Sequence, residues 1–256
     1  MFQVIVCIKS VVTAAPKGVA RRTPENSRLN PFDRPALEAA LQLKSATQGN
    51  VTAVSMGPRV SSETLTEALA MGVDRAVLVS DPALQESDTL VTARVLAAAV
   101  KVLGPYDLLM FGTRTADSDT GQVGPQTAAL MDIPFLSRVT QIDPEGENWT
   151  IERRMDDWTE TWRVALPMAM TIDPRAYPPR PVSLVGVSQA FDQPLIETLT
   201  LKDIHLSEDV VGLSGSPTRV ARLEKVKQDR NCTMLTGDPQ TQAAALMDHL
   251  TQAGIL

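Results

Sequence analysis

The first half of the chain alternates between short apolar runs and segments in which apolar residues recur at helical spacing. The apolar runs are Val4–Ile8, Val51–Ser55, Ala76–Val79 and Leu108–Phe111. Continuous runs of this kind are typical of strands buried on both faces, and parallel strands need crossover helices between them. The alternation therefore predicts an α/β fold with a doubly wound, mostly parallel sheet.

Short polar residues mark where the intervening helices begin. Asp33 is expected to cap the first helix, and Ser61 or Ser62 the second. Asp88 is expected to cap the third, because these side chains accept hydrogen bonds from the first free N–H groups of a helix. A further helix is predicted over Gln122–Met131.

The pattern changes after the fourth predicted strand. Val139–Ile142, Trp149–Arg154 and Thr161–Ala165 are short runs with a period nearer two, separated by turn residues. They predict a small antiparallel β meander. Met168–Ile172 is apolar throughout and is predicted to return to the centre of the sheet.

A proline-rich segment divides the chain. Asp173–Pro181 contains four prolines, so it cannot form a helix or an inner strand. It separates an expected sheet domain, 1–181, from a C-terminal part, 182–256. In that part GLSGSPT (Gly212–Thr218) is expected to be a loop, and Gln240–Leu250 an amphipathic helix. This part cannot build a core alone, so it is interpreted as an arm that packs on a partner chain.

Composition narrows the classes of function. The 256 residues carry a net charge of -6, which argues against a nucleic-acid partner. Cys7, Cys232, His205 and His249 are too few and too scattered for a metal site. The N-terminal run is interrupted by Lys9 and reads as a strand, and the apolar runs are too short to cross a membrane. A cytoplasmic globular protein is expected.

The sequence contains few recognisable catalytic motifs. The chain has no GxSxG, HExxH or P-loop motif and no GxG, so no catalytic residue is assigned. The remaining candidate ligand-binding segments lie at the predicted carboxyl ends of strands. They are Cys7–Lys9, Ser55–Gly57 and Phe111–Gln126. In open α/β sheets, ligands bind outside these ends, where the strand order reverses.

The stretch DSDTGQVGPQ (Asp117–Gln126) indicates a nucleotide site. Gly121 and Gly124 flank the start of the predicted helix, where free N–H groups favour a phosphate. The acids could accept hydrogen bonds from ribose or adenine. An ordinary helix-capping loop explains the same composition about equally well, and Asn30–Asp33 and Ser55–Pro58 also read as turns. The nucleotide interpretation gains weight because all three segments should meet at one edge of a Rossmann-like sheet.

Six segments in this order resemble the β subunit of electron-transfer flavoproteins over nearly the full chain. They are VCIKSVV (Val6–Val12), NPFDRPALEAALQLK (Asn30–Lys44), VTAVSMGP (Val51–Pro58), ETLTEALAMGVDRA (Glu63–Ala76), FGTRTADSDTGQVGPQTA (Phe111–Ala128) and ALPMAMTID (Ala165–Asp173). The resemblance implies a heterodimer that carries electrons from a flavin dehydrogenase, with the principal FAD in the α subunit. The β subunit of the family holds an adenine nucleotide in its sheet domain. On its own, such a chain is an electron carrier subunit rather than a complete enzyme.

The resemblance also implies a set of nucleotide-contacting residues. They are Cys7, Ile8, Lys9, Asn30, Phe32, Asp33, Ser55, Met56, Gly57, Gly112, Thr113, Thr115, Ala116, Asp117, Ser118, Asp119, Thr120, Gly121, Gln122, Val123 and Gly124. Phe32 matches an aromatic residue that approaches the α-subunit flavin. Leu184 matches a leucine that docks into dehydrogenases. Arg154 departs from the family, which usually has an acid there, and this implies either the loss of the usual dehydrogenase contact or a partner with reversed charge.

The family has two branches, in which the β subunit binds either structural AMP or a second FAD. The FAD branch takes a hydride from NADH and splits the electron pair, which is called electron bifurcation. Its loop resembles DxDTxQVGP and its tail GxxGSPT, and Asp117–Pro125 and Gly212–Thr218 match both. We therefore expect FAD, with AMP as the first alternative. The second alternative is a stand-alone nucleotide-binding protein.

Overall fold

The computed structural model describes residues 1–12, 23–146, 148–192, 196–222 and 232–256. These residues group into two compact units, Met1–Arg219 and Val220–Leu256. Among the helices in these ranges, none combines the length and the apolar character that a membrane span requires.

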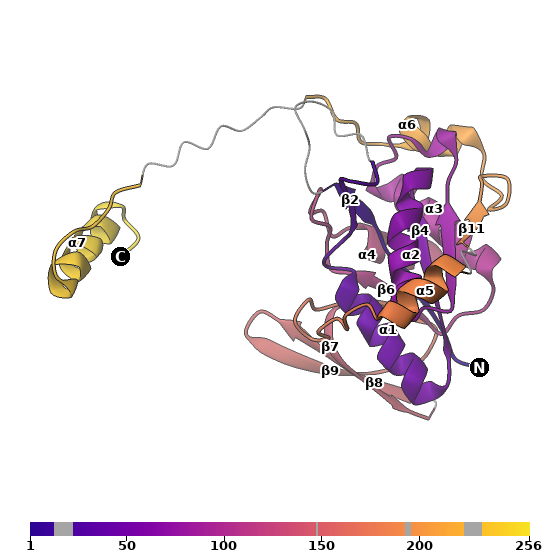
Figure 1. Cartoon of the computed structure of the whole chain (residues 1–256), viewed down its shortest axis with the longest axis horizontal. Coiled ribbons are helices and arrows are strands. Elements are labelled where there is room, and N and C mark those ends of the chain that lie inside the picture. Colours follow the sequence, from indigo (N-terminus) through magenta and orange to yellow (C-terminus); the bar gives the residue numbers. More distant parts are fainter. Residues whose placement is uncertain (13–22, 147, 193–195, 223–231) are drawn as a thin grey trace. The chain divides into compact units, whose positions relative to one another are not determined.

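The first unit is built on a sheet of nine strands in the described ranges (Figure 1). Across the sheet they are β11 (Ile196–Leu199), β5 (Arg75–Val79), β4 (Asn50–Met56), β1 (Gln3–Cys7), β6 (Leu108–Gly112), β10 (Met168–Ile172), β7 (Phe135–Glu145), β8 (Asn148–Met155) and β9 (Trp158–Val164). Pairing is parallel from β11 to β7 and antiparallel from β7 to β9. The predicted α/β class is confirmed, and the antiparallel meander continues the main sheet.

Helices cover both faces of this sheet. They are α1 (Arg34–Thr47), α2 (Ser62–Met71), α3 (Thr89–Leu103) and α4 (Val123–Met131). Further along the chain, α5 (Leu184–Asp192) packs against α2, and α6 (Gly212–Gly215) is a short helix. Val4 of β1 packs in one core cluster with α1 and α2, whereas its neighbour Ile5 packs in the other with α3 and α4. Successive side chains of a strand point to opposite faces, so two covered faces require the continuous apolar run seen in the sequence.

Two small elements were not predicted from the sequence. β2 (Ser10–Val12) and β3 (Ser27–Leu29) form a separate antiparallel pair beyond the end of β1. At its end the N–H of Asn30 donates to the carbonyl oxygen of Lys9 (3.0 Å). The pair therefore carries Asn30 to the carboxyl end of β1.

The predicted helix caps are partly wrong. Asp88 caps α3 as predicted, because its carboxylate accepts from the N–H of Val91 (2.9 Å). Neither Asp33 nor Ser61 makes a side-chain cap hydrogen bond. Asp33 turns inward and binds other partners, as described below. GLSGSPT was expected to be a loop, but its first four residues form α6.

The proline-rich segment is free of helix and strand, as predicted. It is tied to α1 by Arg180, whose N–H, Nε and Nη2 donate to the carboxylate of Glu38 at 2.8–3.1 Å. Glu38 is buried, so the guanidinium compensates a charge that burial would otherwise disfavour. Beyond it, Gly186 of α5 lies so close to α2 that a Cβ would stand 2.2 Å from the Ala70 carbonyl oxygen.

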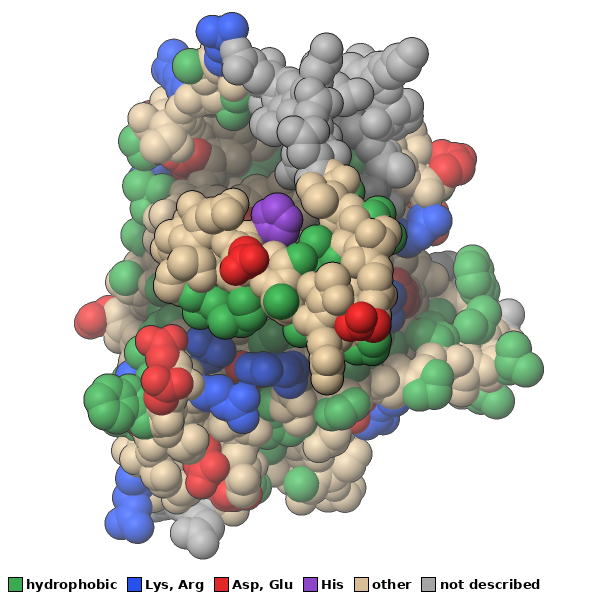
Figure 2. Space-filling model, turned by 90° about the vertical axis from the view of Figure 1, so that its left-hand side faces the viewer, with side chains coloured by type: hydrophobic (Ala, Val, Ile, Leu, Met, Phe, Trp, Pro, Cys, Tyr) green, Lys and Arg blue, Asp and Glu red, His purple; other side chains and the backbone are tan. Residues whose placement is uncertain are grey.

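The second unit contains the predicted C-terminal helix, α7 (Pro239–Gln252). Asp238 caps it by accepting from the N–H of Thr241 (2.9 Å). None of the residues of α7 is buried, and Leu246 and Met247 are about half exposed. Figure 2 shows one face of the molecule, where hydrophobic side chains are interspersed with polar and charged ones. The role of 182–256 in binding a partner stays a prediction.

Candidate functional site

The candidate site lies where the strand order reverses. β1 pairs with β4 on one side and with β6 on the other, and Cys7 is level with Phe111. The chain moves outward from β1 to β4 and β5, and then returns to β6. The segments that follow β1 and β6 therefore leave the sheet side by side at its carboxyl edge, the usual ligand position in such folds.

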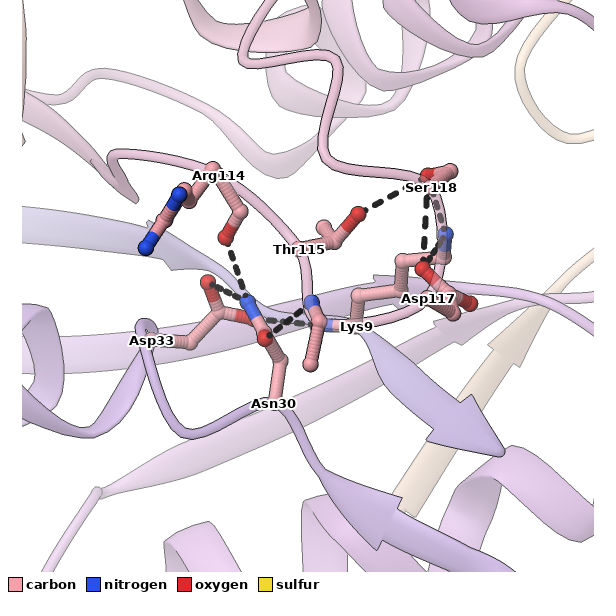
Figure 3. A network of polar contacts seen from close by, with 8 residues as sticks. Lys9, Asn30, Asp33, Arg114, Thr115, Asp117 and Ser118 are labelled. Atoms are coloured by element: carbon pink, nitrogen blue, oxygen red, sulfur yellow. Dashed lines mark hydrogen bonds and ion pairs between the residues drawn. The ribbon is translucent and has the colours of Figure 1, made fainter. Parts of the chain in front are cut away.

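Lys9 links the ends of these two strands (Figure 3). Its Nζ donates to Asp117 Oδ1 (2.8 Å) and, at longer range, to Ser118 Oγ (3.4 Å). Its backbone N–H donates to Asp33 Oδ2 (2.7 Å). The side chains of Lys9 and Asp117 are only 33% and 21% exposed, so this ion pair is partly shielded from water.

Asn30 holds the loop after β6 in place. Its side chain is fully buried, and its Nδ2 donates to Asp33 Oδ1 (2.8 Å) and to the carbonyl oxygen of Arg114 (2.9 Å). Its Oδ1 accepts from the N–H of Ala116 (3.2 Å). The amide therefore uses both donors and its acceptor, and it fixes the backbone on both sides of Thr115.

Asp33 is a buried acid at the centre of this network. Burial raises the pKa of Asp33 to about 7, because a desolvated carboxylate is disfavoured. Hydrogen bonds from Lys9 and Asn30 and the charge of Lys9 oppose this rise. Gly112 makes the close packing possible, since a Cβ there would lie 2.3 Å from Asp33 Oδ1 and 2.5 Å from the Phe32 carbonyl oxygen.

Arg114 stacks on Phe32, with its guanidinium carbon 4.5 Å from the ring centroid. Arg114 Nη1 also lies 3.3 Å from Asp119 Oδ1. The sequence-based set omitted Arg114, although a basic residue in a loop directly after a central strand is a recognisable signal. Thr115 and Ser118 share a hydrogen bond of 2.8 Å, so the loop Thr113–Gln122 is held by several internal contacts.

The start of α4 closes the loop. Gln122 is the residue before the helix, and its Oε1 accepts from Thr89 Oγ1 (3.0 Å). Gly121 has a φ of +63°, which favours glycine. Gly124 is buried, and a Cβ there would lie 3.3–3.4 Å from Phe111 and Thr171. Its lack of a side chain therefore serves the packing of α4 against the sheet.

The structure brings some of the predicted site residues into one network and leaves others outside it. The network joins Lys9, Asn30, Asp33, Thr115, Ala116, Asp117 and Ser118. Cys7, Ile8 and Ser55 lie outside the network and are buried, and Met56 and Gly57 are half-buried at the end of β4. Burial also raises the pKa of the Cys7 thiol, which disfavours a reactive thiolate. The contacts of all these residues with a nucleotide stay predictions.

Comparisons with known proteins agree with this architecture. The family described as electron transfer flavoprotein domain matches residues 18–203. The "Caffeyl-CoA reductase-Etf complex subunit CarD" of Acetobacterium woodii is 37% identical over 99% of this chain and 100% of its own length. The "Electron transfer flavoprotein subunit beta" of Clostridium acetobutylicum is 36% identical, over 94% and 95%. "Protein FixA" of Azorhizobium caulinodans is 34% identical, over 86% and 83%.

Proposed function

This chain belongs to the electron transfer flavoprotein family, and from that membership we propose that it is the β subunit of a heterodimer. Its relatives named β subunit and FixA mark it as an electron-transfer flavoprotein subunit. The proposed partner is an α subunit that carries the principal FAD. Electrons would pass between that FAD and either NADH or a flavin dehydrogenase.

The observation that carries the proposal is the Lys9–Asn30–Asp117 network at the point where the strand order reverses. Lys9 brings a positive charge to the carboxyl edge, and the start of α4 adds N–H groups with a favourable dipole for phosphates. Asp117 and Ser118 bring oxygen atoms that can accept hydrogen bonds from ribose hydroxyls. These donors and acceptors together support a nucleotide as the ligand.

We propose FAD rather than AMP as that nucleotide. Val123 lacks a hydroxyl that could hold a terminal phosphate, and Gly121 leaves space where a larger side chain would stand. When bound, a flavin supplies the redox chemistry, since it accepts a hydride from NADH and releases electrons singly. The chain's own residues bind and orient it. Gly212–Thr218 matches the same branch of the family, and this favours electron bifurcation.

Two relatives indicate the kind of assembly. One is named as a subunit of a caffeyl-CoA reductase–Etf complex, and another, from Anaerotignum propionicum, as an acryloyl-CoA reductase electron transfer subunit.

For this chain we propose a partner flavoenzyme that docks on α5. Leu184 is 90% exposed, and Val185 and Phe191 are also largely exposed. Leu184→Ala should leave folding unchanged and slow electron transfer to that enzyme.

The nucleotide content of the co-purified α/β complex tests the proposal. The complex is denatured and the released nucleotides are separated and quantified. Two FAD and no AMP per heterodimer are expected. One FAD and one AMP would contradict the proposal of FAD and bifurcation, and would indicate a conventional carrier with a structural nucleotide. One FAD and no other nucleotide would show that the loop does not hold a nucleotide.

A variant pair locates the second nucleotide. Lys9→Met removes the ion pair with Asp117 and is expected to lose one nucleotide per heterodimer. Lys44→Met is the matched control, because Lys44 Nζ forms a similar ion pair with Asp74 (2.6 Å) away from this edge. Full retention of both nucleotides in Lys9→Met would place the nucleotide elsewhere.

A further inference from the structure

The tail segment Gly212–Thr218 packs closely against the turn that precedes α3. Gly212 has a φ of +58°, and a Cβ there would stand 2.1 Å from the carbonyl oxygen of Ala83, in the 3-10 helix η2 (Pro82–Leu84). A Cβ on Gly215 would stand 2.2 Å from the backbone of Val210. Both glycines are therefore required by the fit of this segment, which indicates a fixed position rather than a variable loop.

Polar contacts attach the segment to the N-terminus of α3. The N–H of Asp88 donates to Ser216 Oγ (2.9 Å), and Ser216 is only 6% exposed. Thr218 donates twice to Asp88 Oδ2, from its N–H (3.0 Å) and from its Oγ1 (2.7 Å). The other carboxylate oxygen of Asp88 caps α3 at Val91. One side chain thus joins the tail to the first turn of the helix.

The next residue along α3 reaches the candidate site. Thr89 Oγ1 donates to Gln122 Oε1 (3.0 Å), directly before α4. A continuous chain of contacts therefore runs from Thr218 through Asp88 and Thr89 to Gln122. Another contact with α3 is made by a residue that precedes the tail segment and lies off this path: Arg94 Nη1 donates to the carbonyl oxygen of Val210 (2.6 Å).

We propose that Gly212–Thr218 is a positioning element of the nucleotide site. It holds Asp88 and Thr89 so that Gln122 and the start of α4 keep the geometry that receives the phosphates of a nucleotide. Thr218 and Thr89 act through Gln122 and touch no ligand themselves. This inference rests on the proposed nucleotide function of the loop, and it adds residues that the loop sequence does not reveal.

The test measures the affinity of the α/β complex for FAD and for AMP after the nucleotide of the β subunit has been removed. Thr218→Val removes one hydroxyl bond to Asp88 and should weaken binding of the nucleotide found in the native complex by about tenfold. Thr218→Ser keeps the hydroxyl and should restore binding. Arg94→Gln loses the contact with Val210 and can lower the melting temperature, but should leave the affinity unchanged.

A double variant tests whether the contacts act in series. Thr89→Val should weaken binding on its own, and the Thr218→Val/Thr89→Val pair should weaken it by less than the product of the two effects, because both break one path. The shape of the visible spectrum of bound flavin should change in the same variants. Wild-type affinity in Thr218→Val, failure of the serine variant to restore binding, or an equal loss in Arg94→Gln would overturn the inference. A wild-type complex that binds neither FAD nor AMP at this loop would instead contradict the proposed function.

Discussion

At the scale of single residues, the site depends on side chains that never reach the surface. Asn30 has no exposed area, yet it binds the backbone on both sides of Thr115. Asp33 occupies the interior between Lys9 and Gly112. Buried polar groups of this kind are costly unless every hydrogen bond is made, so replacing one of them affects both stability and the shape of the loop.

Asn30→Ala is predicted to destabilise the chain and to abolish nucleotide binding. Its three partners lose a hydrogen bond inside the protein, which should cost about 1–3 kcal/mol of unfolding free energy. Chemical denaturation and nucleotide retention measure the two effects. Asn26→Ala is the control, since Asn26 accepts from the N–H of Thr23 (2.8 Å) in the preceding turn. Similar results for both variants would contradict the special role of Asn30.

Asp33 predicts a pH dependence of stability in the nucleotide-free chain. The pKa of Asp33 is about 7 when folded and near the ordinary 3.8 when unfolded. Between these values the folded state holds a proton that the unfolded state has lost. The contribution of Asp33 to the unfolding free energy is therefore fully present below pH 3.8. It is lost as the pH rises towards 7, by up to about 1.4 kcal/mol per pH unit.

Asp33→Asn removes this titration. Unfolding free energies of the wild type and the variant, measured by urea denaturation from pH 5 to 8, should diverge in favour of the variant until about pH 7 and then run parallel. Because other titrating groups are common to both proteins, their contributions cancel in the difference. A constant difference across this range would show that Asp33 is ionised throughout.

At the scale of elements, the loop before α4 combines two glycines with different tasks. Gly121 is exposed and adopts a positive φ, whereas Gly124 is buried against Phe111 and Thr171. Substituting Gly124 therefore disturbs the contact between α4 and the sheet as well as the loop. Gly121 separates the two effects, because its surroundings are largely solvent.

Gly121→Ala is predicted to weaken nucleotide binding with a smaller loss of stability than Gly124→Val. The strained φ should cost about 1 kcal/mol, and a Cβ would lie 3.0 Å from the Thr113 carbonyl oxygen. Gly124→Val should lower both binding and the melting temperature. Titration with FAD and thermal unfolding of both variants provide the comparison. A Gly124→Val protein of wild-type stability would show that α4 can move away from the sheet without loss.

At the scale of the whole molecule, the chain separates into a sheet-based unit and a short C-terminal unit. The first contains the candidate site and the segment Gly212–Thr218. The second contains α7, which has no buried residue. An amphipathic helix that buries nothing within its own unit is suited to binding elsewhere, and we propose the α subunit as its partner.

Removal of residues 220–256 is predicted to weaken the α/β complex and to preserve the sheet unit. Circular dichroism and thermal unfolding should show an intact first unit, while co-purification with the α subunit falls. A truncation from Leu206 is less informative, because it also removes Ser216 and Thr218. Undiminished co-purification after removal of 220–256 would assign the α-subunit contact to the first unit.

The sequence-based predictions succeeded where a structural element produces a clear pattern in neighbouring residues. Central strands such as β1 and β6 were predicted because burial on both faces produces continuous apolar runs. The short strands β2, β3 and β11 were missed, since three or four residues carry too little periodicity. The inward orientation of Asp33 was missed because its position before Pro35 resembles an ordinary cap.

The α/β class, the succession of central strands and helices along the chain, and the family resemblance carried by motifs such as Asp117–Gln126 could all be predicted from the sequence. These features follow from periodicity and short motifs, which are local properties of a chain. The contacts by which distant residues support that loop became apparent only in the folded structure. Asn30 reaches Arg114 across 84 positions, and Thr218 reaches Asp88 across 130. Contacts at such separations leave no periodic trace in the sequence, because packing of the folded sheet and helices brings these residues together.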